Sequence, residues 1–327
     1  MQIIKAGYEV FKDTVAPVIK VEQVARVCYK SEDKIGEGTA EKMVRALVKR
    51  KHYAMIEHTS LVVEVTKDLY TILKGMRDFM EDNGWKCFIR FSGIDGRYLV
   101  SGNMRAWVDL ICANYGSIPS YALEKIFRGE KYGIFFEGIE AEVRLAHTES
   151  AVEVDPTELA GVEEEIHRDL TVKFIVDRGV SHEIVRHRVA SFAQESTRYC
   201  NYGTKGGEIT VIEPFYLMAD GVNVSTDNWS ERYGAWVSAC EEAEKSYLRM
   251  IADGASPQEA RAVLPTSLKT EVVMTANLRE WRHFFILRAC GVTGKPHPQM
   301  LEVAVPLLKE VKELIPVVFD DLEPMEV

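Results

Sequence analysis

Three arginines, Arg186, Arg188 and Arg198, stand within thirteen positions of the chain, among histidines and hydroxyl residues. A guanidinium group stays charged at any working pH and matches phosphate and carbonyl acceptors bidentately. The cluster therefore predicts a site for small anionic ligands. Glu183 and Glu195 are interleaved with the arginines, so a solvated surface patch of mixed charge explains the composition equally well.

The secondary structure expected around the arginines would divide them between two ligands. A helix over residues 182–189 would place Glu183, Arg186 and His187 on one face, because residues three and four positions apart are neighbours on a helix. Arg188 would then point elsewhere. We therefore expect the arginines to serve two different anionic ligands.

Hydroxyl and thiol side chains follow the arginines. Residues 191–197 are polar, without proline or a strong apolar period, and predict a loop whose N–H groups and hydroxyls can bind an anion. Ser196 has no base near it in a triad order, and a hydroxyl nucleophile needs an activating base. We interpret Ser196 as a substrate ligand. Cys200 leaves the alternative of a thiolate nucleophile open.

The rest of the chain alternates strand and helix patterns and predicts an α/β (α+β) fold with a mixed sheet flanked by helices. No GxGxxG or GxxxxGK[ST] sequence is present, so a nucleotide would be bound by side chains more than by a phosphate-cradling loop. Residues 67–167 predict a mostly helical segment with breaks at Asn83–Gly84, Ser92–Gly93 and Ser101–Gly102. The expected strands are 2–10, 61–65, 170–176, 208–215 and 271–275, and the expected helices are 21–29, 39–51, 228–252, 277–289 and 298–314, with a further helix beginning at Ser256–Pro257.

Composition excludes several classes of protein. The 327 residues are 46% apolar, enough for a substantial core, and the formal net charge of −10 argues against broad nucleic-acid or membrane binding. No apolar run is long enough for a transmembrane helix, and the N-terminal residues do not resemble a secretory signal. Six cysteines without CxxC spacing predict reduced thiols and no metal site. We expect a cytoplasmic protein.

One short sequence occurs twice in similar form. Residues 101–107, SGNMRAW, are similar to residues 275–281, TANLREW. Seven residues do not distinguish a duplication from a recurrent helix start. We interpret the similarity as coincidence or as a distant repeat without shared chemistry.

The arginine region resembles the signature of flavin-dependent thymidylate synthases. The order is RHR at 186–188, seven residues, then Ser196, with Arg198 and Tyr199 two and three places on. The preceding residues 177–183 and the following residues 200–202 are also similar to members of that family. Further similarity lies in family order at residues 25–28, 52–58, 260–265 and 277–288, so the resemblance covers about residues 1–65 and 168–315.

The resemblance implies a methyltransferase that makes dTMP from dUMP without a protein nucleophile. Methylenetetrahydrofolate would supply the carbon, and NADPH would supply reducing equivalents through FAD. In the family the position of Cys200 is not catalytic. The family assembles its sites from several subunits, so the resemblance implies a homotetramer that binds small molecules and neither nucleic acid nor membrane.

The resemblance also assigns residues to the two ligands. Arg288 would lie at the uracil edge of dUMP and stabilise charge that develops on the ring. The other implied dUMP-binding residues are Glu183, Arg186, Gln194, Glu195, Ser196, Thr197, Arg198 and Arg261. The implied FAD-binding residues are Cys28, His52, Ala54, Arg186, His187, Arg188, Gln194, Asn277, Leu278, Arg279 and His283.

Helical spacing is consistent with the role of Arg288. Asn277, Trp281, Phe284 and Arg288 form one stripe at i, i+4, i+7 and i+11. Asn277 and Arg288 would then lie at the two ends of a packed aromatic pair. We interpret Trp281 and Phe284 as core, and Asn277 as an N-cap as well as a ligand.

The chain also departs from the family. Cys28 and Ala54 replace hydroxyl residues common at positions that touch FAD, and His283 replaces an amide seen in some relatives. The interval from Glu57 to Arg186 is far longer than the family needs. We therefore predict a catalytic domain formed by residues 1–66 and 168–327, and an insertion of unknown role at 67–167.

Two alternatives stay open. The first is another flavin- or nucleotide-dependent transferase on the same scaffold. The second is a nucleic-acid-binding module in which the arginines contact phosphates while Phe192, Tyr199 and Tyr202 stack on bases. Acidic residues interrupt the basic cluster, which argues against the second alternative because nucleic-acid binders present a basic stripe.

Overall fold

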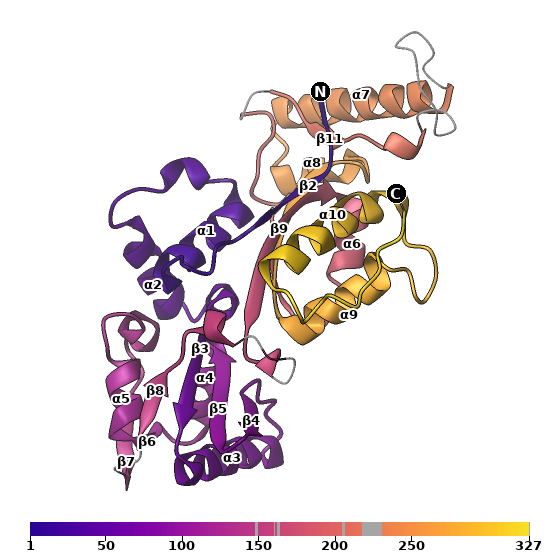
Figure 1. The fold of residues 1–327 in the computed structure, drawn as a ribbon. Coiled ribbons are helices and arrows are strands. Elements are labelled where there is room, and N and C mark those ends of the chain that lie inside the picture. Colours follow the sequence, from indigo (N-terminus) through magenta and orange to yellow (C-terminus); the bar gives the residue numbers. More distant parts are fainter. Residues whose placement is uncertain (148–149, 160, 162–163, 205–206, 218–230, 327) are drawn as a thin grey trace.

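The computed structural model describes residues 1–326 except 148–149, 160, 162–163, 205–206 and 218–230. Helices and several sheets combine in an elongated molecule (Figure 1), which confirms the predicted α/β class. The strands are β1 (Gln2–Ile4), β2 (Gly7–Val10), β3 (Ser60–Val65), β4 (Arg90–Ile94), β5 (Arg97–Asn103), β6 (Ser117–Ser120), β7 (Glu142–His147), β8 (Ala151–Glu153), β9 (Asp169–Asp177), β10 (Ser191–Gln194), β11 (Thr210–Ile212) and β12 (Lys269–Asn277). The α-helices are α1 (Pro17–Tyr29), α2 (Thr39–Lys49), α3 (Lys67–Asp82), α4 (Met104–Ala113), α5 (Tyr121–Phe127), α6 (Arg178–Ile184), α7 (Glu231–Ala252), α8 (Pro257–Ala260), α9 (Leu278–Arg288) and α10 (Pro298–Leu314).

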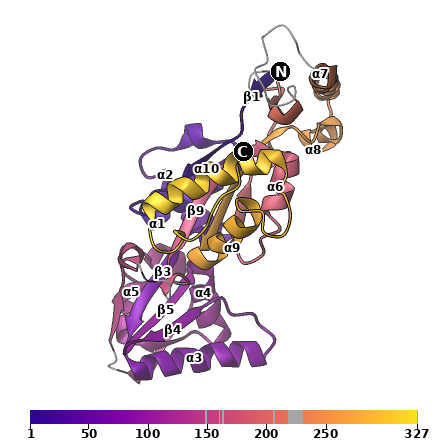
Figure 2. The same cartoon turned by 45° about the vertical axis from the view of Figure 1, so that its right-hand side comes forward.

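The sheet that carries the arginine region has the order β10-β12-β9-β2, with every neighbouring pair antiparallel. Helices α9 and α10 cover one of its faces (Figure 2), where Phe174 of β9, Trp281 of α9 and Leu307 of α10 are fully buried in one core cluster. On the other face, Ala193 and Val273 join the cluster that contains α1. Both faces of the sheet are therefore covered, which explains the nearly continuous apolar run of β9.

A second antiparallel sheet has the order β4-β5-β3-β8. Leu61 and Val63 of β3 pack with Trp107 of α4 and Leu69 of α3 on one face. The same cluster includes residues of α1 and α2, so the segment 67–143 shares a core with the first 66 residues. The division of the chain into a catalytic domain and an insertion stays a prediction.

The third layer lies at the opposite end of the molecule from the second sheet (Figure 1). Strand β1 pairs in parallel with β11, and α7 and α8 pack beside this pair. Tyr247 of α7, Val211 of β11 and Leu268 form its core. The predicted start of α7 at Asn228–Ser230 lies outside the described residues.

The predicted breaks of the middle segment are wrong at two places. Ser92–Gly93 lies inside β4 and Ser101–Gly102 lies inside β5, so 67–167 contains strands as well as helices. Pairing with the distant β3 supplies the ladder that local sequence does not specify. A Cβ at Gly102 would lie 2.5 Å from Ile89 Cδ1, so glycine here allows a close approach rather than a turn.

Three other boundaries differ from expectation. Residues 191–194 form β10 instead of a loop, because they pair with β12. The predicted helix over 182–189 ends at Ile184. The single strand expected over 2–10 is divided between two sheets.

Polar caps explain where the helices of the site begin. Asn277 accepts a hydrogen bond from Glu280 N at 2.9 Å, which confirms the predicted N-cap of α9. Ser256 and Glu259 form a capping box at α8. Helix α10 spans the predicted residues 298–314. Within the described residues, none of the helices combines the length and apolarity needed to traverse a bilayer.

Candidate active site

The RHR sequence lies on a loop that follows a short helix. Asp177 ends β9, and its carboxylate caps α6 by accepting a hydrogen bond from a backbone N–H of the first turn at 2.7 Å. The helix ends at Ile184, so the arginines do not share a helical face as expected. Arg186 and Arg188 are exposed, whereas His187 is 8% exposed. The loop therefore presents two cations to solvent and inserts the imidazole into the protein.

Arg288 joins this loop to α9. Its Nη1 donates to Glu183 Oε2 at 2.6 Å, and its Nε donates to His187 Nε2 at 3.2 Å. Burial, together with the charges of Arg288 and His283, lowers the pKa of His187 to about 4. A neutral imidazole can accept the hydrogen bond from Arg288. Three predicted residues from two distant parts of the sequence thus form one cluster.

The stripe predicted on α9 is present. Trp281 and Phe284 are 0% exposed and pack edge to face, with ring centroids 5.3 Å apart, which confirms them as core. The His187 ring lies 4.9 Å from the Phe284 ring. Arg288 therefore extends from a rigid aromatic core, which restricts the positions its guanidinium can take.

The side chain of Gln194 points back towards α6. Its Nε2 donates to Ser181 Oγ at 2.9 Å and to Thr270 Oγ1 at 3.2 Å. This places the amide of Gln194 between α6 and β12. It lies at the end of β10, where the chain leaves the sheet for the predicted dUMP-binding segment.

Glu195 is enclosed by protein partners. It is 2% exposed, and its carboxylate accepts hydrogen bonds from Tyr202 OH at 2.9 Å and Lys269 Nζ at 3.0 Å. Lys30 Nζ lies 3.7 Å away. Burial, together with the Glu195 charge, raises the pKa of Tyr202. The carboxylate holds the segment in place and does not face solvent in this structure.

The next three predicted residues form a turn beside Glu195. Ser196 Oγ accepts a hydrogen bond from Arg198 N at 3.3 Å, and Thr197 is 9% exposed. The Arg198 guanidinium lies 5.5 Å from the centroid of the exposed Tyr199 ring. Arg198 is thus available to an anion at the surface, while Thr197 is nearly enclosed.

Arg261 lies on a second turn supported by the same small core. It is exposed and begins the 3-10 turn Arg261–Val263 after α8. Val263 packs against the cluster that contains Cys200 and Tyr202. The Arg261 turn and the turn of Arg198 are therefore held in the same part of the molecule.

A cavity of about 460 Å³ lies between the two four-stranded sheets. Arg188 and Asn277 line it from the side of the sheet β10-β12-β9-β2, and Phe88, Asn103 and Arg105 line it from the side of the sheet β4-β5-β3-β8. Phe88 is 61% exposed. Of the predicted flavin-binding residues, Arg188 and Asn277 are the two that line this cavity. Sequence reasoning missed the contribution of the sheet β4-β5-β3-β8, which no local motif indicated.

The other predicted flavin-binding residues of α9 lie elsewhere. Leu278 is 0% exposed in the core, and Arg279 Nε donates to Glu165 Oε1 at 2.6 Å. The His283 ring lies 5.9 Å from the His187 ring. Only His283 therefore joins the cluster of Arg288.

The three N-terminal residues predicted to touch FAD line neither of the two cavities described here. The carbonyl of Cys28 accepts a hydrogen bond from Ser196 N at 3.1 Å, so α1 supports the predicted dUMP-binding turn. His52 is exposed between α2 and β3, and Ala54 is half-buried there.

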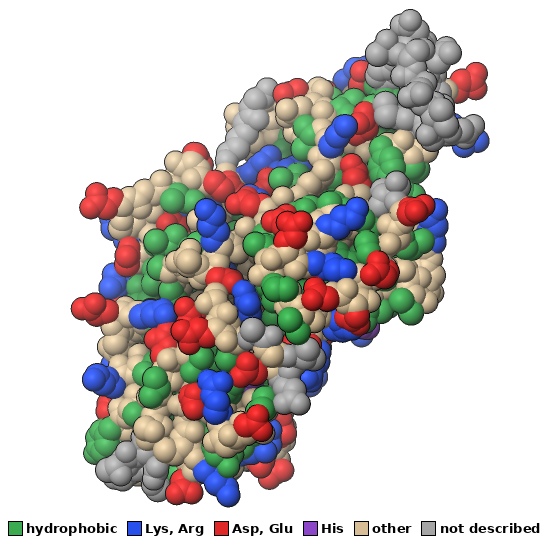
Figure 3. All heavy atoms as spheres, viewed as in Figure 1, with side chains coloured by type: hydrophobic (Ala, Val, Ile, Leu, Met, Phe, Trp, Pro, Cys, Tyr) green, Lys and Arg blue, Asp and Glu red, His purple; other side chains and the backbone are tan. Residues whose placement is uncertain are grey.

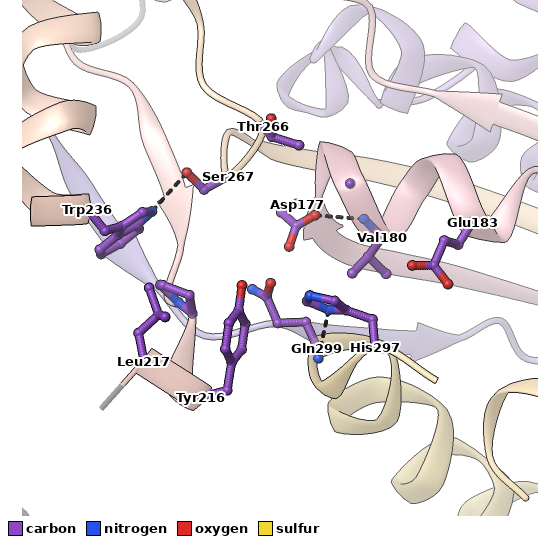
Figure 4. Close-up of a pocket in the computed structure, with 12 residues that line it drawn as sticks. Asp177, Val180, Glu183, Tyr216, Leu217, Trp236, Thr266, Ser267, His297 and Gln299 are labelled. Carbon is purple, nitrogen blue, oxygen red and sulfur yellow. Dashed lines mark hydrogen bonds between the residues drawn. The ribbon is translucent and has the colours of Figure 1, made fainter. Parts of the chain in front are cut away.

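A second cavity, of about 390 Å³, was not predicted (Figure 4). Asp177, Tyr216, His297 and Gln299 surround it, and Glu183 points towards it from α6. Burial raises the pKa of Asp177. Among the described residues that line it there is no lysine or arginine, so it offers a phosphate no cation. The helix-capping Asp177 and the His297–Pro298 helix start were local signals, but their convergence depends on the fold.

The sequence of the site was compared with known families and proteins. Residues 166–317 match the family model described as thymidylate synthase complementing protein. The matched segment, just under half of the chain, is similar to flavin-dependent thymidylate synthases. The matched segment contains the RHR loop, Arg261 and Arg288.

Curated relatives agree with this family. A flavin-dependent thymidylate synthase of Geobacter sulfurreducens is 32% identical over 149 residues, which are 46% of this chain and 58% of the relative. One of Pyrococcus abyssi is 33% identical over 43% of this chain and 54% of the relative. The chain thus spans just over half the length of the curated relatives it matches.

Solved structures are similar only at a low level. A UMP/dUMP methylase PolB from Streptomyces cacaoi, bound with 5-Br dUMP, aligns over 98% of this chain and 96% of its own, with 16% identity and a TM-score of 0.44. This similarity is too weak to support any inference about the fold or the site.

The 460 Å³ cavity fits a flavin nucleotide by its chemistry. Its volume lies within the range of small-molecule pockets, about 300–1,000 Å³. The guanidinium groups of Arg105 and Arg188 can bind phosphate oxygens, and Phe88 and Val189 present apolar surface for a ring system. The described residues therefore suit an anionic ligand that carries an aromatic ring.

Proposed function

We propose that this protein is a flavin-dependent thymidylate synthase. It would convert dUMP to dTMP with methylenetetrahydrofolate as carbon donor and NADPH as reductant, through FAD. The observation that carries the proposal is the cluster of Arg288, Glu183 and His187, which lies inside the segment that matches the family. The names of the curated relatives support the flavin.

One group of side chains would bind the substrate, and another would bind the cofactor. Arg198 and Arg261 are exposed cations supported by one core and would bind the dUMP phosphate. Arg188 and Asn277 would bind the flavin from their cavity. When bound, the flavin supplies the hydride-transfer chemistry. The remaining residues of both predicted sets are proposed to act with these four, including Cys28, His52 and Ala54 from another subunit of a homotetramer. The other members are Glu183, Arg186, His187, Gln194, Glu195, Ser196, Thr197, Leu278, Arg279, His283 and Arg288.

Arg288 would act at the uracil ring. Making uracil C5 nucleophilic moves negative charge onto the ring oxygens and N3, and a fixed cation there stabilises that charge. The neutral His187 accepts from Nε of Arg288 and Glu183 accepts from Nη1, so both orient the guanidinium without consuming every N–H donor. A pre-organised donor of this kind is worth about 2.7–4 kcal/mol.

The proposal includes location and partners. We place the protein in the cytoplasm, with small molecules and copies of itself as partners. On the face shown in Figure 3, basic and acidic side chains are intermingled rather than arranged in a stripe. That arrangement favours the enzyme over a nucleic-acid-binding module.

Tritium release from 5-labelled dUMP tests the proposal, in the presence of FAD, NADPH and methylenetetrahydrofolate. The wild type should release tritium, and the purified protein should take up FAD with an absorbance near about 450 nm. Arg288→Ala should still bind FAD but release tritium about 100- to 1,000-fold more slowly.

Arg282→Ala is the matched control for this variant. Arg282 lies on the same helix and pairs with Asp321 at the surface, away from the cluster. It should retain wild-type release. Normal release by Arg288→Ala would refute the assigned role, and colourless protein that takes up no FAD would refute the function.

A further inference from the structure

The two four-stranded sheets share the arrangement of three strands. The order β10-β12-β9 in one sheet corresponds to β4-β5-β3 in the other, and every pairing is antiparallel. The fourth strand is connected differently, because β2 precedes β9 in the chain and β8 follows β5. In both, the second strand ends in an asparagine that caps the following helix: Asn103 caps α4, and Asn277 caps α9. The similarity of residues 101–107 and 275–281 thus continues over a strand–helix–strand–strand–helix unit. The first unit consists of β3, α3, β4, β5 and α4, and the second consists of β9, α6, β10, β12 and α9, with β11, α7 and α8 between β10 and β12. Coincidence is no longer an adequate interpretation.

Hydrogen bonds within the two units coincide residue by residue. Met104 N donates to Thr59 O, and Leu278 N donates to Arg168 O, each at 3.0 Å. The indoles behave alike: Trp107 Nε1 donates to the carbonyl of Leu61, and Trp281 Nε1 donates to the carbonyl of Leu170. In both cases the same difference in residue number relates β3 to β9, and a second constant difference relates α4 to α9. Such a pattern is expected of a duplicated unit whose connecting segments differ in length.

Contacts between the units are reciprocal. His58, two residues before β3, is hydrogen-bonded through Nδ1 to Thr275 Oγ1 of the other unit at 2.8 Å. Its counterpart His167, two residues before β9, is hydrogen-bonded through Nδ1 to Ser101 Oγ at 2.8 Å. Reciprocal pairs of this kind define an isologous, two-fold interface. The two units therefore face each other as two subunits of a dimer would.

The 460 Å³ cavity lies in this internal interface. Arg188 enters it from the second unit, while Asn103, Arg105 and Asp109 line it from α4 of the first. On α4 these three residues occupy the positions that Asn277, Arg279 and His283 hold on α9. The first unit has kept the asparagine and the arginine of the predicted flavin set, although it lacks the RHR sequence.

Some arginine N–H groups in the cavity are not used in ion pairs with the protein's own carboxylates and can donate hydrogen bonds to an anion. Arg90 is engaged bidentately by Asp169, at 2.6 and 3.0 Å. Arg105 donates from Nη1 to Glu57 at 2.7 Å and from Nε to Asp109 at 3.3 Å, which leaves Nη2 without a partner among the described residues. Arg188 is exposed, with no carboxylate partner in the described part of the chain.

We propose that the first unit supplies a second wall of the flavin site from the same chain: Arg105 binds a phosphate of the dinucleotide opposite Arg188, and Phe88 packs against one of its rings. This inference rests on the proposed function, because it takes the flavin as the ligand. Phe88 is 61% exposed on the wall of the cavity, where a ring system would cover it. The role of the insertion is then to supply a second wall for the cofactor.

Titration of FAD fluorescence by the full-length protein tests this inference without measuring turnover. Arg105→Ala and Phe88→Ala should each weaken FAD binding by about tenfold or more, since each removes a charge-assisted or aromatic contact. Arg45→Ala and Phe79→Ala are matched controls. Arg45 is an exposed arginine that pairs with Glu137, Phe79 is an exposed phenylalanine on α3, and neither lines the cavity.

The outcomes separate this inference from the proposed function. Wild-type protein that binds no FAD overturns both. FAD bound by the wild type and equally well by Arg105→Ala and Phe88→Ala overturns the inference alone. Circular dichroism melts of each variant identify loss of fold, and Phe88→Ala remains decisive because an exposed side chain contributes little to stability.

Discussion

The buried ion pair between Lys269 and Glu195 allows a direct test of what holds the predicted dUMP-binding segment in place. Lys269 is 7% exposed and Glu195 is 2% exposed. Burial acts to lower the pKa of Lys269, but Glu195 and Glu271 together hold it above its usual value. Replacing Lys269 with methionine keeps the volume and removes the charge, so the Glu195 carboxylate would remain buried without its main counter-ion.

The size of the stability loss depends on the partners that Glu195 keeps when Lys269 is replaced. Breaking a buried ion pair by removing one partner costs about 3–5 kcal/mol. Tyr202 OH still donates to Glu195, and Lys30 lies 3.7 Å away, so partial compensation is available. We therefore expect Lys269→Met to lower the free energy of unfolding by about 3 kcal/mol, the lower end of that range.

Urea unfolding followed by circular dichroism measures this loss. Lys245→Met is the matched control, because Lys245 pairs with Glu242 on the exposed face of α7 and such pairs contribute about 0–1 kcal/mol. The double variant Lys269→Met with Glu195→Gln should regain part of the stability, since no charge is then left buried. A loss no larger than that of Lys245→Met, or a double variant less stable than Lys269→Met, would refute the reasoning.

Two further predictions concern pH. Burial lowers the pKa values of His58, His167 and His187 to about 3, 4 and 4, below the value of about 6.5 expected when unfolded. The unfolded chain therefore binds more protons between about pH 6.5 and 4, and stability should fall by up to about 4 kcal/mol per pH unit in that window. Urea midpoints at pH 7, 6 and 5 that do not decrease would contradict this. Burial, together with the neighbouring Glu213 and Asp177, raises the pKa of Glu302 to about 7, so ionisation at higher pH costs stability in the folded state. Glu302→Gln should stabilise by about 1–2 kcal/mol at pH 8 after allowance for solvent screening, and by less at pH 5; equal melting-temperature shifts at both pH values would exclude the carboxylate as the cause.

Local sequence was sufficient for the elements whose signals are local. Helix α10 was predicted at its observed bounds because a proline at its first position and a continuous apolar stripe both mark it. The N-cap role of Asn277 and the core role of Trp281 followed from spacing along one helix. These features depend on residues within a few turns of one another.

Strand pairing was less accessible to sequence reasoning. Residues 191–194 and the glycine pairs at 92–93 and 101–102 are polar or small and looked like loops, yet each belongs to a strand. Their hydrogen bonds go to partners far along the chain, and a short strand acquires its preference from that partner rather than from its own residues.

The sequence by itself indicated the resemblance to a family, the residues that carry charge and the helix that carries Asn277 and Arg288. Only the tertiary structure decided that Arg288 meets Glu183 and His187, that the carboxylate of Glu195 is buried, and that the strand order β4-β5-β3 corresponds to β10-β12-β9. The physical reason for this division is that a sequence motif specifies only which side chains stand at neighbouring positions in the chain. Desolvation, ion pairing and two-fold packing depend on which distant segments the fold brings into contact.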